Sequence, residues 1–128
     1  MSRLLLIDDD PDFSSALAVE LRRAGHMVMC ASSCDEGLDV LSTMGSERNV
    51  DAVLVDIFMP GVDGFETIHA LRDAGIAAPV IAISGGGTKK LDEVLDWATS
   101  LGADASLAKP FLADRLIMLV DAFVPDRH

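Results

Sequence analysis

Three aspartates, a serine and a lysine of this sequence each follow a short apolar run, either directly or one residue later. They are Asp8, Asp9, Asp56, Ser84 and Lys109. Two carboxylates about 5 Å apart repel each other by roughly 3 kcal/mol at an effective dielectric constant near 20, so a cluster of three favours a divalent cation. All-oxygen ligands with room for water favour Mg²⁺. The lysine would add a second positive charge, leaving a place between the two for a small dianion.

Phosphoryl transfer to an aspartate requires a carboxylate nucleophile, a bridging cation, a lysine and a hydroxyl. We expect Asp56 to be the nucleophile because its apolar run predicts a central strand. Asp8 and Asp9 are adjacent, which suits them better to holding metal. Ser84 would donate a hydrogen bond, and Gly85 after it lets backbone N–H groups approach a phosphate closely. A purely structural interpretation of the aspartates leaves the serine and the lysine unexplained.

Five apolar runs of four or five residues alternate with five segments of helical periodicity. The runs are Leu4–Ile7, Met27–Ala31, Ala52–Val55, Val80–Ile83 and Ala105–Ala108. Their length and the Gly, Pro, Asp and Ser residues beside them predict strands buried on both faces. The strict alternation predicts an α/β fold, a doubly wound (βα)5 three-layer sandwich around a parallel five-stranded sheet. Ligands of such sheets bind beyond the carboxyl ends of the strands, where the candidate residues lie.

Capping signals predict where the helices begin. Asp10 before Pro11 predicts an N-cap followed by proline at the first helical position, and Gly25 predicts the end of that helix. Ser33 with Glu36 is a capping-box pattern for the second helix. The three later helices are expected around Asp63–Gly75, Leu91–Leu101 and Leu112–Phe123.

Length and charge narrow the class of protein. A chain of 128 residues is enough for one core, so we expect residues 1–128 to form a single domain. Ten basic and twenty-one acidic residues give a formal net charge of −11, which disfavours direct binding to nucleic acid or to an anionic membrane surface. The sequence has no membrane-spanning apolar stretch and no secretory signal pattern, so we expect a cytoplasmic location. Cys30 and Cys34 are too few for a disulfide framework.

The sequence around the candidate residues resembles the receiver domains of two-component response regulators. The matching stretches are Leu5–Asp10, Val53–Glu66, Pro79–Ser84 and Lys109–Phe111. Their joint order and spacing are specific, and the likeness covers essentially the whole chain. The resemblance implies a flavodoxin-like sheet with strand order 2-1-3-4-5.

The resemblance also implies a role for each acidic residue. Asp56 would accept a phosphoryl group from a phosphohistidine on a sensor histidine kinase or a histidine phosphotransfer protein. Mg²⁺, or Mn²⁺ in its place, would be bound by Asp9, Asp56 and the backbone carbonyl of Phe58, with Asp8 holding it partly through water. The expected protein is a stand-alone receiver that catalyses only its own phosphorylation and dephosphorylation.

This sequence departs from the family in a residue that transmits the phosphorylation signal to the output surface. Ser84 stands at the Thr/Ser switch position and Lys109 at the phosphate-pairing lysine. Three residues before that lysine the family often has an aromatic residue, whereas this sequence has Ser106 and no tyrosine. We therefore expect a different or weaker output, through contact with a downstream protein target or through a phosphorelay. Trp97 is expected to be half-buried or to anchor a docked partner, and a homodimer through the last two helices stays open.

Two other functions also stay open. A small haloacid-dehalogenase-like phosphatase carries its nucleophile and acid in an Asp-x-Asp pattern on the first strand, here Asp8 and Asp10. The sequence lacks the cap and the late acidic pair of that class. A degenerate receiver used only as a docking module would need none of the retained site residues. A phosphoryl mimic trapped on Asp8 would favour the phosphatase, and one trapped on Asp56 would favour the receiver.

Overall fold

The computed structural model describes residues 3–43, 50–57, 64–84, 102–108 and 113–123. Within these ranges the elements follow one another as β1 (Arg3–Ile7), α1 (Pro11–Arg23), β2 (Met27–Ala31), α2 (Cys34–Thr43), β3 (Ala52–Asp56), α3 (Gly64–Asp73), β4 (Val80–Ser84), β5 (Ala105–Ala108) and α5 (Ala113–Phe123). The helix expected over Leu91–Leu101 lies outside the described residues. Among the described helices there is none whose length and hydropathy would let it cross a bilayer.

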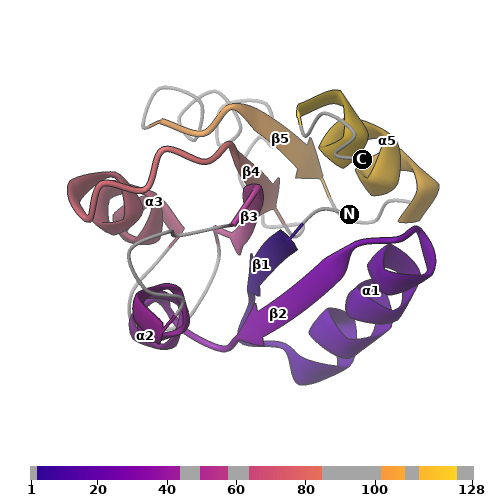
Figure 1. Ribbon diagram of the computed structural model, residues 1–128, viewed down its shortest axis with the longest axis horizontal. Coiled ribbons are helices and arrows are strands. Elements are labelled where there is room, and N and C mark those ends of the chain that lie inside the picture. The colour runs from indigo at the N-terminus through magenta and orange to yellow at the C-terminus, as the bar shows by residue number, and fades with distance from the viewer. Residues whose placement is uncertain (1–2, 44–49, 58–63, 85–101, 109–112, 124–128) are drawn as a thin grey trace.

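The strands form one parallel sheet in the order β2-β1-β3-β4-β5. Figure 1 shows α1 and α5 on one face of this sheet and α2 and α3 on the other. The prediction of a doubly wound three-layer α/β fold is therefore confirmed, and so is the strand order that the family resemblance implies. β1 and β3 are central strands, so the residues at their carboxyl ends lie at the middle of the sheet edge.

The apolar runs are continuous because both faces of the central strands are covered. Along β1, Leu5 and Ile7 pack with residues of α2 and α3, whereas Leu4 and Leu6 pack with residues of α1 and α5. All four side chains are fully buried. Full burial of such a side chain contributes roughly 1.5–3 kcal/mol, and a strand that feeds two cores has no face left for polar residues.

The first helix begins as the sequence predicts. Asp10 is the N-cap of α1, and its carboxylate accepts hydrogen bonds from the backbone N–H groups of Asp12 and Phe13 at 3.1 and 3.2 Å. Pro11 occupies the first turn, where a missing N–H costs nothing. After the helix, Gly25 adopts a φ of 98°, a left-handed conformation that glycine adopts readily.

An Asp10→Ala variant is expected to lower the free energy of unfolding by about 1 kcal/mol, because two N–H groups of the first turn lose their acceptor. Urea denaturation measures this loss. An Asp10→Ser variant keeps a capping oxygen and should recover most of the stability. Equal losses in both variants would contradict the capping role.

The capping box of the second helix forms with a shifted partner. Ser33 Oγ accepts from the backbone N–H of Glu36 at 3.1 Å, as the pattern predicts. The Glu36 carboxylate, however, accepts from the backbone N–H and the hydroxyl of Ser32, at 3.3 and 3.0 Å. This glutamate therefore fixes Ser32, which lies between the end of β2 at Ala31 and the cap residue Ser33.

Candidate functional site

Asp8, Asp9 and Asp56 meet at the carboxyl ends of β1 and β3. The two strands pair in parallel with Ile7 opposite Val55, so the next residue of each chain segment, Asp8 or Asp56, emerges at the same edge. A carboxylate oxygen from each of the three aspartates lies within 4.8 Å of one from each of the others. The expected acidic cluster is therefore formed by the fold.

The burial of the three carboxylates is unequal. Asp8 and Asp56 are only 2% and 5% exposed, whereas Asp9 is exposed. The carboxylates of Asp8 and Asp56 are close together and poorly hydrated, so they repel each other strongly, and a cation among the three aspartates relieves that repulsion. The donor set consists of carboxylate oxygens alone, which fits a hard divalent cation.

The position of Asp8 is fixed by three neighbouring residues, one in β2, one in α1 and one at the N-cap of α1. Its backbone N–H donates to the carbonyl of Ala31 in β2 at 3.0 Å. Its Oδ1 accepts from the backbone N–H of Asp10 at 2.9 Å, and its backbone carbonyl lies 3.5 Å from the hydroxyl of Ser14 in α1. The first and third contacts hold the backbone of Asp8, and the second orients its carboxylate, an oxygen of which lies within 4.8 Å of one from Asp56.

Asp10 does not belong to this cluster. Its carboxylate is turned to the start of α1, where it caps the helix, and the group of aspartates found among the described residues is Asp8, Asp9 and Asp56. A haloacid-dehalogenase-like phosphatase would need Asp10 as its acid beside Asp8. The capping geometry therefore counts against that alternative.

Ser84 closes β4 at the same edge. Asp56 is the last residue of β3 and is in register with Ile83, so the backbone of Ser84 lies one residue further along the neighbouring strand. Ser84 is in turn in register with Ala108, the last residue of β5. Four other expected site residues lie outside the described residues: Phe58, Gly85, Trp97 and Lys109. Lys109 directly follows Ala108 in the sequence.

Ser106 lies in the middle of β5, in register with Ala82 of β4. Its neighbours Ala105 and Leu107 both pack with residues of α1 and α5. Because side chains alternate along a strand, Ser106 faces the opposite side of the sheet and is partly exposed there. At the position where the resemblance implies an aromatic residue, β5 therefore carries the small hydroxyl of Ser106.

A pocket of about 260 Å³ adjoins the acidic cluster, with Asp8, Asp9, Ser14, Cys30 and Glu36 among its lining residues. Sequence reasoning missed the place of Cys30, because only the β1–β2 pairing brings that strand beside the site. Cys30 is exposed at the surface, and the partial burial of its thiol raises the pKa of that group, an effect that the Arg22 guanidinium partly opposes.

Alkylation of Cys30 by iodoacetamide is expected to be slower at pH 7 than that of a free cysteine, because the raised pKa keeps the thiol protonated and only the thiolate reacts. The rate should rise with pH along a curve displaced to higher pH. Fragment mass spectrometry separates Cys30 from Cys34. A Cys30 that reacts faster than the free reference at pH 7 would contradict this assignment.

A comparison with protein families matches residues 4–121 to the response regulator receiver domain. The chain is 34% identical over 128 residues to the transcriptional regulatory protein CpxR of Escherichia coli, covering all of this chain and 51% of that protein. It therefore spans about half the length of this relative. The protein PilH of Pseudomonas aeruginosa is 32% identical over 124 residues, with 95% of this chain and 97% of PilH covered.

Solved structures agree with these relatives. The receiver domain of the Francisella response regulator 1452 superposes with a TM-score of 0.83 at 28% identity, covering 96% of each chain. The Vibrio cholerae chemotaxis protein CheY4 superposes with a TM-score of 0.84 at 24% identity, a likeness of fold that covers 97% of this chain and 99% of CheY4. With its acidic cluster at the carboxyl ends of β1 and β3 and a family match over residues 4–121, this chain belongs to the response regulator receiver domain family.

Proposed function

We propose that this receiver domain takes a phosphoryl group onto Asp56 in a Mg²⁺-dependent reaction, with Mn²⁺ as a substitute ion. The observation that carries the proposal is the cluster of Asp8, Asp9 and Asp56, whose carboxylate oxygens lie within 4.8 Å of one another. Asp56 is the nucleophile because it stands at the end of the central strand β3 and is 5% exposed. A poorly hydrated carboxylate attacks phosphorus without first shedding a full water shell.

The metal would be held by Asp9, Asp56 and the backbone carbonyl of Phe58, with Asp8 bound partly through water. When bound, the ion neutralises charge on the phosphoryl oxygens and on the carboxylates around it. Asp8 is well suited to help bind the metal because the backbone N–H of Asp10 already orients its carboxylate.

The proposed chemistry is a single displacement at phosphorus. An oxygen of Asp56 forms a bond to the phosphorus atom of a phosphohistidine while the phosphorus–nitrogen bond breaks. The imidazole leaves with the bonding electrons and takes up a proton. Ser84, the backbone N–H of Gly85 and Lys109 contact the phosphoryl oxygens, and the domain catalyses only this reaction and the later hydrolysis of its own acyl phosphate.

The proposed phosphoryl donor is a sensor histidine kinase or a histidine phosphotransfer protein in the cytoplasm. The output is altered contact with a downstream protein target, or passage of the phosphoryl group along a phosphorelay, through a surface that includes Trp97 and Ser106. Met118 is exposed on α5, which supports a homodimer through the last two helices. We further propose that residues 1–128 form one receiver domain, and that its own surface binds neither nucleic acid nor membrane directly, because the net charge is −11.

Chemical trapping tests the assignment. The protein is incubated with acetyl phosphate and Mg²⁺, the acyl phosphate is reduced with borohydride, and peptide mapping locates the modified residue. Modification of Asp56 that needs Mg²⁺ supports the receiver mechanism. Modification of Asp8 points to the phosphatase alternative, and the absence of any Mg²⁺-dependent product points to a docking module.

A further inference from the structure

A second pocket lies at the amino-terminal end of the sheet, away from the acidic cluster. It has a volume of about 380 Å³ and is lined by Arg3, Arg22, His26, Met27, Val28 and Met29. Arg3 opens β1 and His26 directly precedes β2, whereas the acidic cluster stands at the carboxyl ends of the strands. The pocket shares no lining residue with that cluster, so it is a separate feature of the fold.

The lining of this pocket joins positive charge to an apolar surface. Two guanidinium groups and an imidazole are present, and none of the described lining residues is acidic, although the carboxylates of Asp51 and Asp121 lie beside Arg3 and His26. Only ten residues of the whole chain are Lys or Arg, so two arginines at one pocket are a local excess in a chain of net charge −11. Met27, Val28 and Met29 supply the apolar part, and thioether side chains adapt readily to a ligand's shape.

The side chain of His26 is nearly enclosed but lacks hydrogen bonds. It is 7% exposed, and neither ring nitrogen has a hydrogen-bond partner among the residues that the structure describes. The Asp121 carboxylate of α5 is 3.3 Å from Nε2, within the distance of an ion pair but without hydrogen-bond geometry. A buried polar group in this condition gains from a ligand that supplies the missing partner.

The two arginines are placed differently. Arg22 Nη2 donates to the backbone carbonyl of Val28 at 2.9 Å, which holds that guanidinium against the edge strand β2. Arg3 is in register with Met27, and its backbone N–H, not its side chain, donates to Asp51 Oδ2 at 2.7 Å. The guanidinium of Arg3 makes no hydrogen bond or ion pair with the described residues. It is therefore available to a ligand.

We propose that this pocket binds a small amphipathic anion, a carboxylate or sulfonate carried on an aromatic or short aliphatic body. The anionic group would pair with Arg3 and reach the Arg22 and His26 side of the lining, while the body would contact the methionines and Val28. Small-molecule sites have volumes of roughly 300–1,000 Å³ and combine an apolar lining with a few polar groups. The pocket meets both conditions.

The probes are 4-phenylbutyrate and its uncharged counterpart 4-phenylbutan-1-ol, titrated into ¹⁵N-labelled protein. We expect 4-phenylbutyrate to shift the amide resonances of residues 26–29 to saturation, and the alcohol to bind about tenfold more weakly because it lacks the charge that the arginines recognise. Amides that do not respond at millimolar probe, or that respond equally to both compounds, would overturn the proposal.

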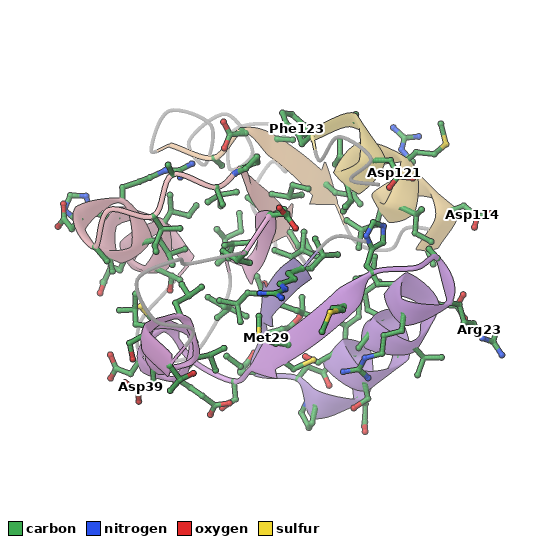
Figure 2. The ribbon with its side chains drawn as sticks, viewed as in Figure 1. Arg23, Met29, Asp39, Asp114, Asp121 and Phe123 are labelled. Atoms are coloured by element: carbon green, nitrogen blue, oxygen red, sulfur yellow. The ribbon has the colours of Figure 1, made fainter. Side chains whose placement is uncertain are left out.

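Matched variants identify the residues involved. Arg3→Gln removes a charge from the pocket and should weaken 4-phenylbutyrate about tenfold. Arg23→Gln removes the same charge next to Arg22, but Arg23 is 75% exposed, pairs with Glu20, does not line the pocket and extends outward beyond α1 (Figure 2). The Arg23→Gln variant should leave the affinity for 4-phenylbutyrate unchanged.

A third variant tests the apolar side of the pocket. Met27→Glu places a carboxylate beside Arg3 at a position that is 49% exposed and so tolerates charge. It should abolish saturable binding because it both repels the anion and occupies the arginine. If Arg3→Gln and Arg23→Gln weaken 4-phenylbutyrate binding equally, the effect comes only from the net charge of the protein. If the Met27→Glu variant binds 4-phenylbutyrate as tightly as the wild type, the probe binds at another place. Either result would overturn the proposal.

Discussion

An Asp56→Asn variant should lose phosphorylation by several orders of magnitude. The amide is a far weaker nucleophile than the carboxylate, and it also removes one negative charge from the group that would hold Mg²⁺. Asp56 is 5% exposed at the end of β3. Because asparagine has nearly the same shape as aspartate, the amide should fit the same space and the fold should be retained. Incorporation of label from a phosphohistidine donor, followed over time with Mg²⁺ present, measures the loss.

The matched control for this prediction is Asp51→Asn. Asp51 lies five residues earlier and binds the backbone N–H of Arg3 at the other end of the sheet. The Asp51→Asn substitution removes the same charge from the chain without changing the acidic cluster. The rate of phosphorylation should therefore stay within about twofold of the wild type. If Asp56→Asn accepts label at the same site and at the normal rate, the proposed acceptor is wrong.

An Arg72→Ala variant is expected to lower the free energy of unfolding by about 3 kcal/mol. Arg72 of α3 donates to the carbonyls of Ile76 and Ala78 at 2.9 and 2.8 Å. It also donates to the carbonyl of Gly102 at 2.8 Å and to Asp104 Oδ2 at 3.0 Å. One side chain therefore ties the end of α3 to the segments that lead into β4 and β5.

The loss should exceed that of a single hydrogen bond because the partners are also coupled. The same Asp104 oxygen accepts from the backbone N–H of Val80 at 2.8 Å, so an Asp104 released from Arg72 would loosen the start of β4. Urea denaturation monitored by circular dichroism measures the change.

Two further variants separate geometry from charge. Arg72→Lys keeps the charge but cannot fork toward several carbonyls, so it should recover less than half of the stability. Arg23→Ala removes an exposed arginine and should cost less than about 0.5 kcal/mol. An Arg72→Ala variant as stable as Arg23→Ala would show that the network contributes nothing measurable.

Local features of this protein were predictable because their causes are local. Asp10 caps α1 because its carboxylate reaches N–H groups two and three residues ahead, a contact that needs only the sequence order Asp-Pro. The strands were predictable because Leu4–Ile7 and Ala52–Val55 have no polar face to offer to water. The helix expected over Leu91–Leu101 stays a prediction.

Part of the site could also be predicted, but only with a topological rule. Asp8 and Asp56 are 48 residues apart, and nothing local brings them together. Parallel strands place their carboxyl ends at one edge of the sheet. Because Ile7 pairs with Val55, the residues that follow them, Asp8 and Asp56, lie side by side at that edge. The roles assigned to Ser84 and Lys109 rest on that rule and on the family resemblance.

The sequence alone determined that this chain builds a parallel sheet with acids beyond its strand ends, because periodicity, capping and burial are written in neighbouring residues. Only the tertiary structure decided which side chains from distant segments meet at the two ends of the sheet. Arg72 gathers carbonyls from segments up to 30 residues away, Cys30 lines the pocket beside the acids, and Arg3 joins His26 at the opposite end. Such contacts depend on strand register and helix packing, which single residues do not encode.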